Sequence, residues 1–201
     1  MNEVHVLFEG YSTQNPDGSM SANCSCVLIK TGEVRILVDS MTPWDGPKIK
    51  ESLSQHHCLS QDDIDFVVST HGHSDHVGNN NLFLKATHIV GHSMSHKDKY
   101  FEHDFDASSF TLSPGVFVKA TPGHTLDSVS VIVTDTRLGT IAIVGDLFEK
   151  EEDLLDDQVW IEAGSENVSK QRQNRAAILA LADQIVPGHG PMFSVHKAKV
   201  S

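Results

Sequence analysis

The chain has 201 residues, 39% of them hydrophobic, which is enough for one domain with a buried core and short for two. Its 27 acidic and 15 basic side chains give a formal net charge of -12. This charge repels nucleic-acid phosphates at long range, so any nucleic-acid substrate must be held by local contacts. The absence of a signal-peptide pattern and of an apolar run of about 18 residues predicts a soluble intracellular protein with no membrane contact. We therefore expect a single domain, residues 1–201.

The first predicted elements are strands. Partly alternating runs rich in β-branched residues occupy residues 4–8, 26–31 and 34–40 and are separated by turn sequences such as "NPDGS" and "TGE". This pattern predicts antiparallel strands. The long connection between the first two strands, residues 10–24, is either a flap over a substrate site or only an extended hairpin loop.

A helix is expected after these strands. The segment "DGPKIKESLSQHH", residues 45–57, has Pro47 placed for the first helical turn, and Ile49 and Leu53 lie four residues apart on one face. "SQDD", residues 60–63, resembles a capped turn. The apolar run at 65–70 predicts a strand that ends in a histidine-rich segment.

The second half of the chain again alternates strands with a helix. Apolar runs predict strands at 87–91, 116–121, 128–134, 140–145 and 184–186, and "QNRAAILALAD", residues 173–183, predicts a helix. This order of strands, helix, strands and helix predicts an α/β fold, in which two mixed sheets are flanked by helices as an αβ/βα sandwich.

Metal-binding side chains are concentrated in "STHGHSDHVGN", residues 69–79, which contains His71, His73, Asp75 and His76. Imidazoles and carboxylates share few roles besides binding a hard or borderline cation and transferring protons. With 13 histidines in 201 residues, a chance match to H-x-H-x-D-H is roughly one in a few hundred. The segment therefore predicts a metal site rather than a solvated polar turn.

Three further polar groups also follow apolar β-type runs: His124 in "VKATPGH", Asp146 in "IAIVGD" and His189 in "IVPGH". Side chains just past strand ends converge at one edge of a sheet, and the neighbouring glycines permit sharp turns there. Taken singly, each is better explained as a capping or core histidine or a turn aspartate. Taken together and in order, they predict one shared site.

The ordered set "THGHSDH", "TPGHT", "VGD" and "PGHG", with "LVDS" upstream, resembles the metallo-β-lactamase superfamily of hydrolases over nearly the whole chain. The resemblance implies that superfamily's αβ/βα sandwich and a complete set of ligands for two metal ions. These are His71, His73 and His124 for the first ion, Asp75, His76 and His189 for the second, and Asp146 as the bridge. The cofactor implied is two Zn2+ per chain, with Mn or Fe possible because nitrogen and oxygen ligands do not fix the metal.

The resemblance also implies the chemistry. Two ions about 3.5 to 4 Å apart lower the pKa of a shared water, so hydrolysis by a metal-bridging hydroxide is expected. Asp75 would orient this hydroxide or accept its proton. Asp39, in "LVDS", either supports the site from behind or is structural. His92, in "IVGHS", either donates to substrate at the rim or is a structural or surface histidine.

A closer resemblance concerns the substrate. "GYSTQNPDGS", "STHGHSDHVGNNNLF" and "IVPGHGPMFSV" resemble the subfamily of metallo-β-lactamase domain-containing protein 1. That resemblance implies an endoribonuclease that acts near the 3′ end of histone pre-mRNA, as a homodimer, in the cytosol and nucleus. Because the chain is acidic, we expect RNA to be bound locally or weakly, or with the help of an RNA-processing protein partner. Residues 97–101 either offer phosphate and base-stacking contacts or form a solvated helix start.

Two alternatives stay open. A hydroxyacylglutathione hydrolase-like thioesterase shares the H-x-H-x-D-H motif, but it normally uses a carboxy-terminal helical portion to hold glutathione, which the final "MFSVHKAKVS" does not supply. The other alternative is a metal-site small-molecule-binding protein, in which the site performs no hydrolysis.

Overall fold

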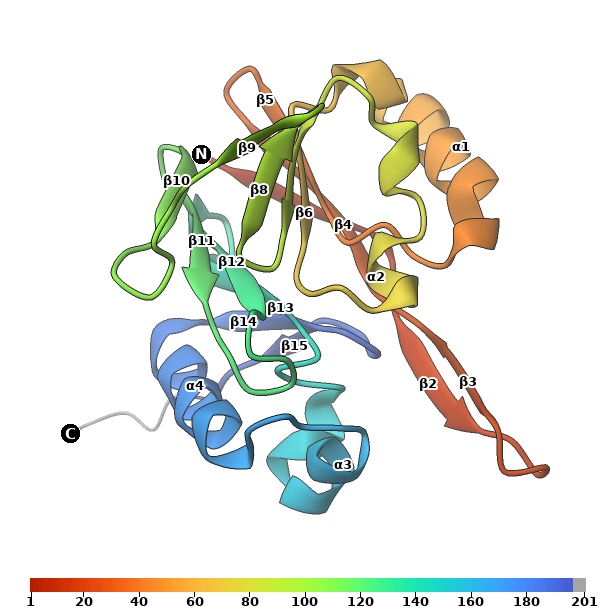
Figure 1. Ribbon diagram of the computed structural model, residues 1–201, viewed down its shortest axis with the longest axis vertical. Coiled ribbons are helices and arrows are strands. Elements are labelled where there is room, and N and C mark those ends of the chain that lie inside the picture. Colours follow the sequence, from red (N-terminus) through yellow and green to blue (C-terminus); the bar gives the residue numbers. More distant parts are fainter. Residues whose placement is uncertain (197–201) are drawn as a thin grey trace.

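The computed structural model (Figure 1) describes residues 1–196; residues 197–201, the end of the expected domain, lie outside the described residues. Seven strands form the first sheet, in the order β1 (Glu3–Phe8), β4 (Cys26–Thr31), β5 (Val34–Val38), β6 (Phe66–Ser69), β7 (Thr87–Val90), β8 (Ser93–His96) and β9 (Lys99–Phe101). Six strands form the second sheet, in the order β10 (Phe110–Ser113), β11 (Val116–Ala120), β12 (Val129–Thr136), β13 (Gly139–Gly145), β14 (Gln184–Pro187) and β15 (Phe193–Ser194).

Both sheets are mixed. In the first, β5, β6 and β7 run parallel to one another, while β1, β4 and β5 pair antiparallel as the sequence predicted. In the second, β13 and β14 pair in parallel and the remaining pairs are antiparallel. The helices are α1 (Gly46–His57), α2 (Ser74–Val77), α3 (Asp157–Glu162) and α4 (Val168–Leu181), with 3-10 turns η1 (Pro43–Asp45), η2 (Gln61–Asp63), η3 (Asn80–Leu82) and η4 (Glu151–Leu154).

The main core lies between the two sheets because alternate residues of each strand point inward. In β5, Ile36 and Val38 face this core and belong to the same buried cluster as Val131 of the second sheet, whereas Leu37 points outward toward α1. Ile49 and Leu53 of α1 cover the outer face of the first sheet, and Ile178 of α4 covers the outer face of the second. These four layers confirm the predicted αβ/βα sandwich.

The element boundaries differ from the prediction in two places that bear on the site. The strand expected at 34–40 ends at Val38, because Asp39 has a φ of 57° and leaves the extended conformation. The helix expected at 173–183 begins at Val168, where the side chain of Asn167 accepts the Lys170 backbone N–H as an N-cap.

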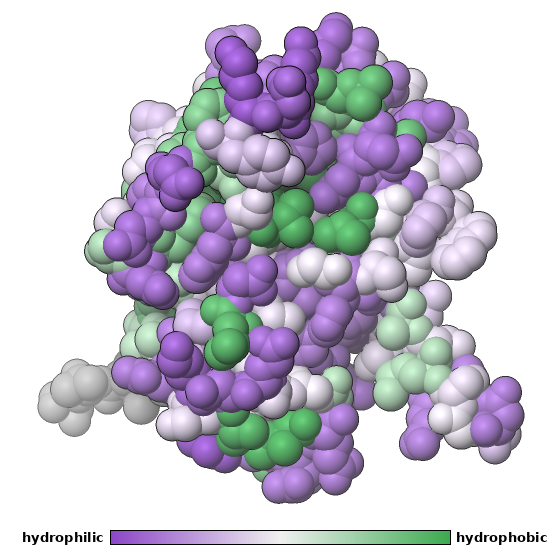
Figure 2. All heavy atoms as spheres, in the orientation of Figure 1, coloured by the Kyte–Doolittle hydropathy of each residue, from purple (hydrophilic) through white to green (hydrophobic). Residues whose placement is uncertain are grey.

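The connection at 10–24 is a hairpin of β2 (Tyr11–Gln14) and β3 (Met20–Asn23), which projects from the body of the molecule at lower right in Figures 1 and 2. The solvated helix start considered for residues 97–101 is wrong. Lys97 lies in a tight turn with a φ of 57°, and Lys99–Phe101 forms the exposed edge strand β9.

Within residues 1–196, no helix combines the length and the apolar character that crossing a membrane requires.

Candidate metal centre

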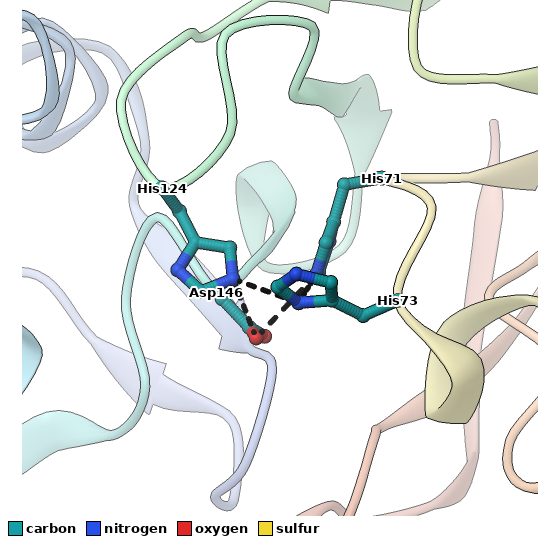
Figure 3. Close-up of side chains that lie close together, drawn as sticks. All are labelled: His71, His73, His124 and Asp146. Carbon is teal, nitrogen blue, oxygen red and sulfur yellow. Dashed lines mark hydrogen bonds and ion pairs between the residues drawn. The ribbon is translucent and has the colours of Figure 1, made fainter. Parts of the chain in front are cut away.

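The seven predicted ligands come from the ends of strands in both sheets. His71 and His73 follow β6, and Asp75 and His76 lie on the short helix α2. His124 follows β11, Asp146 comes directly after β13, and His189 follows β14. Figure 3 shows four of these side chains pointing toward one another across the gap between their segments. The fold therefore brings together residues that are far apart in the sequence.

The first predicted ligand group consists of three imidazoles and Asp146. The Nε2 atom of His71 lies 2.8 Å from Nδ1 of His73, and the Nε2 atom of His124 lies 3.1 Å from the same nitrogen. Oδ2 of Asp146 is 3.6 Å from His71 Nε2 and 3.3 Å from His124 Nε2. Except for His73, which borders the cavity, these residues are buried.

The second predicted group contacts the same aspartate. His76 Nε2 is 3.2 Å from Oδ1 of Asp146, and His189 Nε2 is 3.3 Å from Oδ2. Oδ2 of Asp75 lies 3.7 Å from His189 Nε2 and 3.9 Å from His76 Nε2. Asp146 thus contacts members of both groups, as a bridging residue must.

Groups behind the site fix the orientation of the rings. Oδ2 of Asp39 is 3.0 Å from Nδ1 of His76, and Oδ1 of Asp39 accepts the Thr70 backbone N–H at 2.7 Å. His124 Nδ1 lies 2.7 Å from the carbonyl oxygen of Gly164. His189 Nδ1 lies 3.0 Å from the carbonyl oxygen of Asn23. Such partners set the tautomer and leave Nε2 free for a cation.

The unpaired atoms of the site fit a bound cation. Because a carbonyl oxygen only accepts hydrogen bonds, Nδ1 of His124 carries the proton, and the Nε2 lone pair of its neutral ring faces His73. His76 Nε2 and Asp146 Oδ1 are buried and lack a hydrogen-bond partner within the described part of the chain. Buried polar atoms that face one another without a hydrogen bond are costly unless a proton or a metal cation lies between them.

The charges of the site separate its histidines into two kinds. Burial lowers the pKa of His71 and His124, so both rings are neutral. Burial also disfavours the charged form of His76, but Asp146 and Asp39 outweigh it and raise that pKa well above its usual value. For His189, burial is outweighed chiefly by Asp146, which raises the pKa to about 9. These two rings thus hold protons where the second ion is predicted to bind.

Two glycines of the motifs are required by close contacts. A Cβ at Gly188 would overlap Oδ1 of Asp146, and a Cβ at Gly145 would overlap the Thr70 hydroxyl. Gly145 also has a φ of 51°, which most side chains avoid. Gly145 in "VGD" therefore lets the ligand segments of the two sheets approach each other, and Gly188 in "PGHG" lets the segments after β13 and β14 do the same.

A cavity of about 740 Å³ opens onto the cluster. Its remaining wall is formed by the β2–β3 hairpin, the loop after β13 and α3, with lining residues that include Ser12, Gln14, Met20, Glu149, Lys150 and Glu162. The structure thus places one face of the hairpin beside the predicted site. Glu149 was not predicted from the sequence, although its position three residues after Asp146 in "VGDLFE" was the available signal.

His92 is the candidate that the fold does not bring into the cluster of ligand-type side chains among the described residues. Its ring stacks on Phe105 with centroids 5.3 Å apart, and it is not among the residues that line the cavity. The apolar run before His92 resembles the apolar runs before His124, Asp146 and His189. The chain after it, however, enters the β7–β8 turn and does not lead toward the second sheet.

Residues 22–189 match the family model of the metallo-β-lactamase superfamily. The chain is 43% identical over 199 residues to the metallo-β-lactamase domain-containing protein 1 of Xenopus laevis, covering 98% of this chain and 83% of that protein. It is 38% identical over 185 residues to the Homo sapiens protein of the same name, covering 90% and 67%. These matches confirm both resemblances predicted from the motifs.

The fold also matches solved structures. One is an N-acyl homoserine lactone hydrolase with its product N-hexanoyl-L-homoserine bound at the catalytic metal centre. The TM-score is 0.63 at 18% identity, and the match covers 94% of this chain and 92% of the hydrolase. This likeness concerns the fold alone.

Proposed function

The chain belongs to the metallo-β-lactamase superfamily, and from that premise we propose that it is a binuclear zinc-dependent endoribonuclease that hydrolyses phosphodiester bonds near the 3′ end of histone pre-mRNA. The observation that carries the proposal is the convergence of five imidazoles and two carboxylates, from both sheets, beside an open cavity that five of these seven residues line. The choice of RNA is supported by the resemblance of the motifs to one subfamily.

The proposed ion positions follow the two groups around Asp146. His71, His73 and His124 would hold one ion, Asp75, His76 and His189 the other, and Asp146 would hold both. Bound there, two divalent ions supply Lewis acidity and an activated water. Asp75, whose side chain borders the cavity, would accept the proton of the attacking water. Lys150, which also lines the cavity, would contact a phosphate oxygen of the substrate.

The charge of the cavity makes phosphate binding depend on the ions. Four carboxylates, of Asp75, Asp146, Glu149 and Glu162, and one lysine line the cavity, which is formally negative on its own. Two divalent cations reverse that sign. Without them, the cavity repels a phosphodiester as the whole chain does.

The test is cleavage of an end-labelled histone-type RNA by zinc-loaded protein, beside single-stranded DNA and a glutathione thioester. A chelator-treated sample and an Asp146→Asn variant are the controls. The proposal predicts RNA products with 5′-phosphates and no cleavage in either control. Turnover of the thioester alone would replace the substrate assignment with the thioesterase alternative. No turnover above the metal-free control would favour a small-molecule-binding protein.

The proposed role of Asp75 has a separate test. Asp75→Asn removes the proton acceptor, and we expect kcat to fall about 10²- to 10⁴-fold, as for loss of a general base. The metal content of the variant must be measured alongside, because Asp75 is also a proposed ligand. An Asp75→Asn enzyme that keeps full turnover would exclude this role.

We further propose a homodimer that binds RNA weakly or with an RNA-processing protein partner, in the cytosol and nucleus. The acidic net charge of -12 supports weak, locally held RNA binding. Light scattering on the purified chain gives the mass that tests the dimer.

A further inference from the structure

Glu149 is a buried carboxylate in the wall of the cavity, outside the predicted ligand set. The residue is 5% exposed and lies in the loop between β13 and η4. Within residues 1–196, no hydrogen bond reaches its carboxylate oxygens; the nearest charged partner is His189, with Nε2 3.9 Å from Oε2. Burying an ionised carboxylate without donors costs several kcal/mol in a real protein, so the group takes up a proton unless a cation compensates its charge.

The backbone holds Glu149 firmly at this position. Its N–H donates to Oδ2 of Asp153 at 2.7 Å, and its carbonyl oxygen accepts the N–H of His189 at 2.8 Å. The Arg175 guanidinium, on α4, fixes the same loop by donating to the carbonyl oxygens of Leu147 at 2.8 Å and Asp153 at 2.9 Å. The backbone position of Glu149 is therefore fixed by contacts from three separate segments.

Glu149 lies beside two of the residues assigned to the second ion position, Asp146 and His189. Asp146, Glu149 and His189 each present one ligand-type atom, and these atoms lie within 4.8 Å of one another. The His189 atom concerned is Nε2, because Nδ1 is engaged by the backbone carbonyl of Asn23. The same nitrogen is the one that His189 offers to the second ion.

We propose that Glu149 is a further ligand of the second metal position. The inference rests on the two-ion site of the proposed function and deepens it. Glu149 adds a third carboxylate to Asp75 and Asp146, beside the imidazoles of His76 and His189. Five ligands exceed the four of a structural zinc site but match the five-coordination that a catalytic zinc ion can adopt.

The test is metal binding, which is independent of any substrate. Metal-free wild-type protein and its Glu149→Gln variant are titrated with Zn2+ against a chromophoric chelator, and then with Co2+ by visible absorption. We expect Glu149→Gln to weaken the second ion about tenfold or more and to leave the first within about twofold, in line with losses on removing a carboxylate near a metal. The absorption of the second Co2+ should intensify, because loss of a ligand lowers its coordination number.

Two further variants complete the experiment. Glu162→Gln removes another carboxylate that lines the cavity but lies outside the cluster, and should change neither constant. Glu149→Asp keeps the charge and should retain more of the second-ion affinity than Glu149→Gln; thermal melts of the metal-free forms check folding. Suppose that wild-type protein binds two ions and that Glu149→Gln changes neither the two dissociation constants nor the cobalt spectrum. This result would overturn the role of Glu149 and leave the two-ion proposal standing. A single ion in wild type would overturn this inference and the binuclear proposal together.

Discussion

His76 connects the predicted metal position to the protein behind it. Its Nδ1 atom faces the buried carboxylate of Asp39, while its Nε2 atom faces Asp146. Asp39 in turn accepts the backbone N–H and the hydroxyl of Thr70, the residue that begins the ligand segment. One carboxylate thereby fixes both the ring and the start of the segment that carries it.

Asp39→Asn tests this support. We expect the second ion to bind about 10- to 100-fold more weakly, because the amide fixes the His76 ring and its tautomer less well than a carboxylate does. The measurement is a zinc competition titration. Asp63→Asn, in the exposed capping box of η2, is the control and should leave zinc affinity unchanged. Equal affinities for wild type and Asp39→Asn would show that Asp39 is only structural.

The pH dependence of the metal-free protein follows from His189 and Glu149. The pKa of His189 is raised from 6.5 to about 9, so its stabilising proton is fully held below pH 6.5 and lost as the pH rises through 9. Burial raises the pKa of Glu149 from 4.5 to about 8, so between these pH values the folded chain holds a proton that the unfolded chain has released. Glu149 therefore also lowers the stability of the folded chain as the pH rises.

We therefore expect the Tm of the chelated protein to fall by several degrees between pH 6 and pH 9.5, measured by calorimetry in excess chelator. His189→Asn should show a shallower decline. Zinc-loaded protein is the contrasting sample, since protons compete with the ion for His189 and metal binding strengthens as the pH rises. A chelated protein whose Tm rises over this range would contradict the assignment of these protons.

At the scale of elements, the β2–β3 hairpin has one face on the cavity. Ser12 pairs with Ala22 and Gln14 with Met20, and all four residues line the cavity. The intervening pair, Thr13 and Ser21, lies on the opposite face by the two-residue period of a strand. Because the hairpin forms its own sheet and projects from the body, its side chains can be changed with little cost to the core.

The double variant Gln14→Ala, Met20→Ala is expected to raise KM severalfold and leave kcat within about twofold, because it removes contacts to substrate away from the reacting atoms. The matched control is Thr13→Ala, Ser21→Ala on the other face, which should leave both constants unchanged. The measurement is steady-state kinetics with whichever substrate the cleavage test identifies. Equal KM values for the two double variants would mean that the connection is only an extended hairpin.

The elements that could be predicted from the sequence are those with a strong hydrophobic pattern. Strand β12 and helix α1 combine alternation or helical spacing with turn signals at their ends. The strands that were missed, such as β8, β9 and β15, have four residues or fewer, which is too short to show an alternating pattern, and pairing with a neighbour makes them strands. Helix α3 lies in an acidic stretch in which Trp160 is the buried anchor.

The residues of the site that could be predicted are likewise those that follow a strong sequence pattern. His124, Asp146 and His189 could be predicted because each follows an apolar strand, and strand ends meet at one edge. Glu149 lies in the loop after β13, three residues beyond Asp146, and Arg175, far along the chain on α4, pairs with Asp153 and holds this loop. Such contacts between distant segments leave no periodic signal. His92, for which a structural or surface role was the other prediction, shows that a polar group after an apolar run need not face the other sheet.

At the scale of the whole molecule, the predicted ions would join the two sheets. The first sheet supplies His71, His73, Asp75 and His76 through the segment after β6, and the second sheet supplies His124, Asp146 and His189. Without cations, this junction contains facing lone pairs and buried carboxylates, which oppose the burial of the apolar core between the same sheets. Ions at the junction would therefore stabilise the packing of one sheet on the other.

Removal of metal should then lower the stability of the entire fold. At a free zinc concentration about 1,000 times the dissociation constant, one ion contributes about 4 kcal/mol to the free energy of unfolding. For a domain of this size, 1 kcal/mol shifts Tm by about 2 to 4 °C, so chelation should lower Tm by about 8 to 16 °C per ion. Calorimetry with and without chelator measures the shift.

Asp146→Asn is the control, because it removes the carboxylate shared by both groups and should reduce the shift sharply. An unchanged Tm on chelation of the wild-type protein would mean that the sheets pack without any ion between them, and the predicted ligands would then need another explanation for their burial.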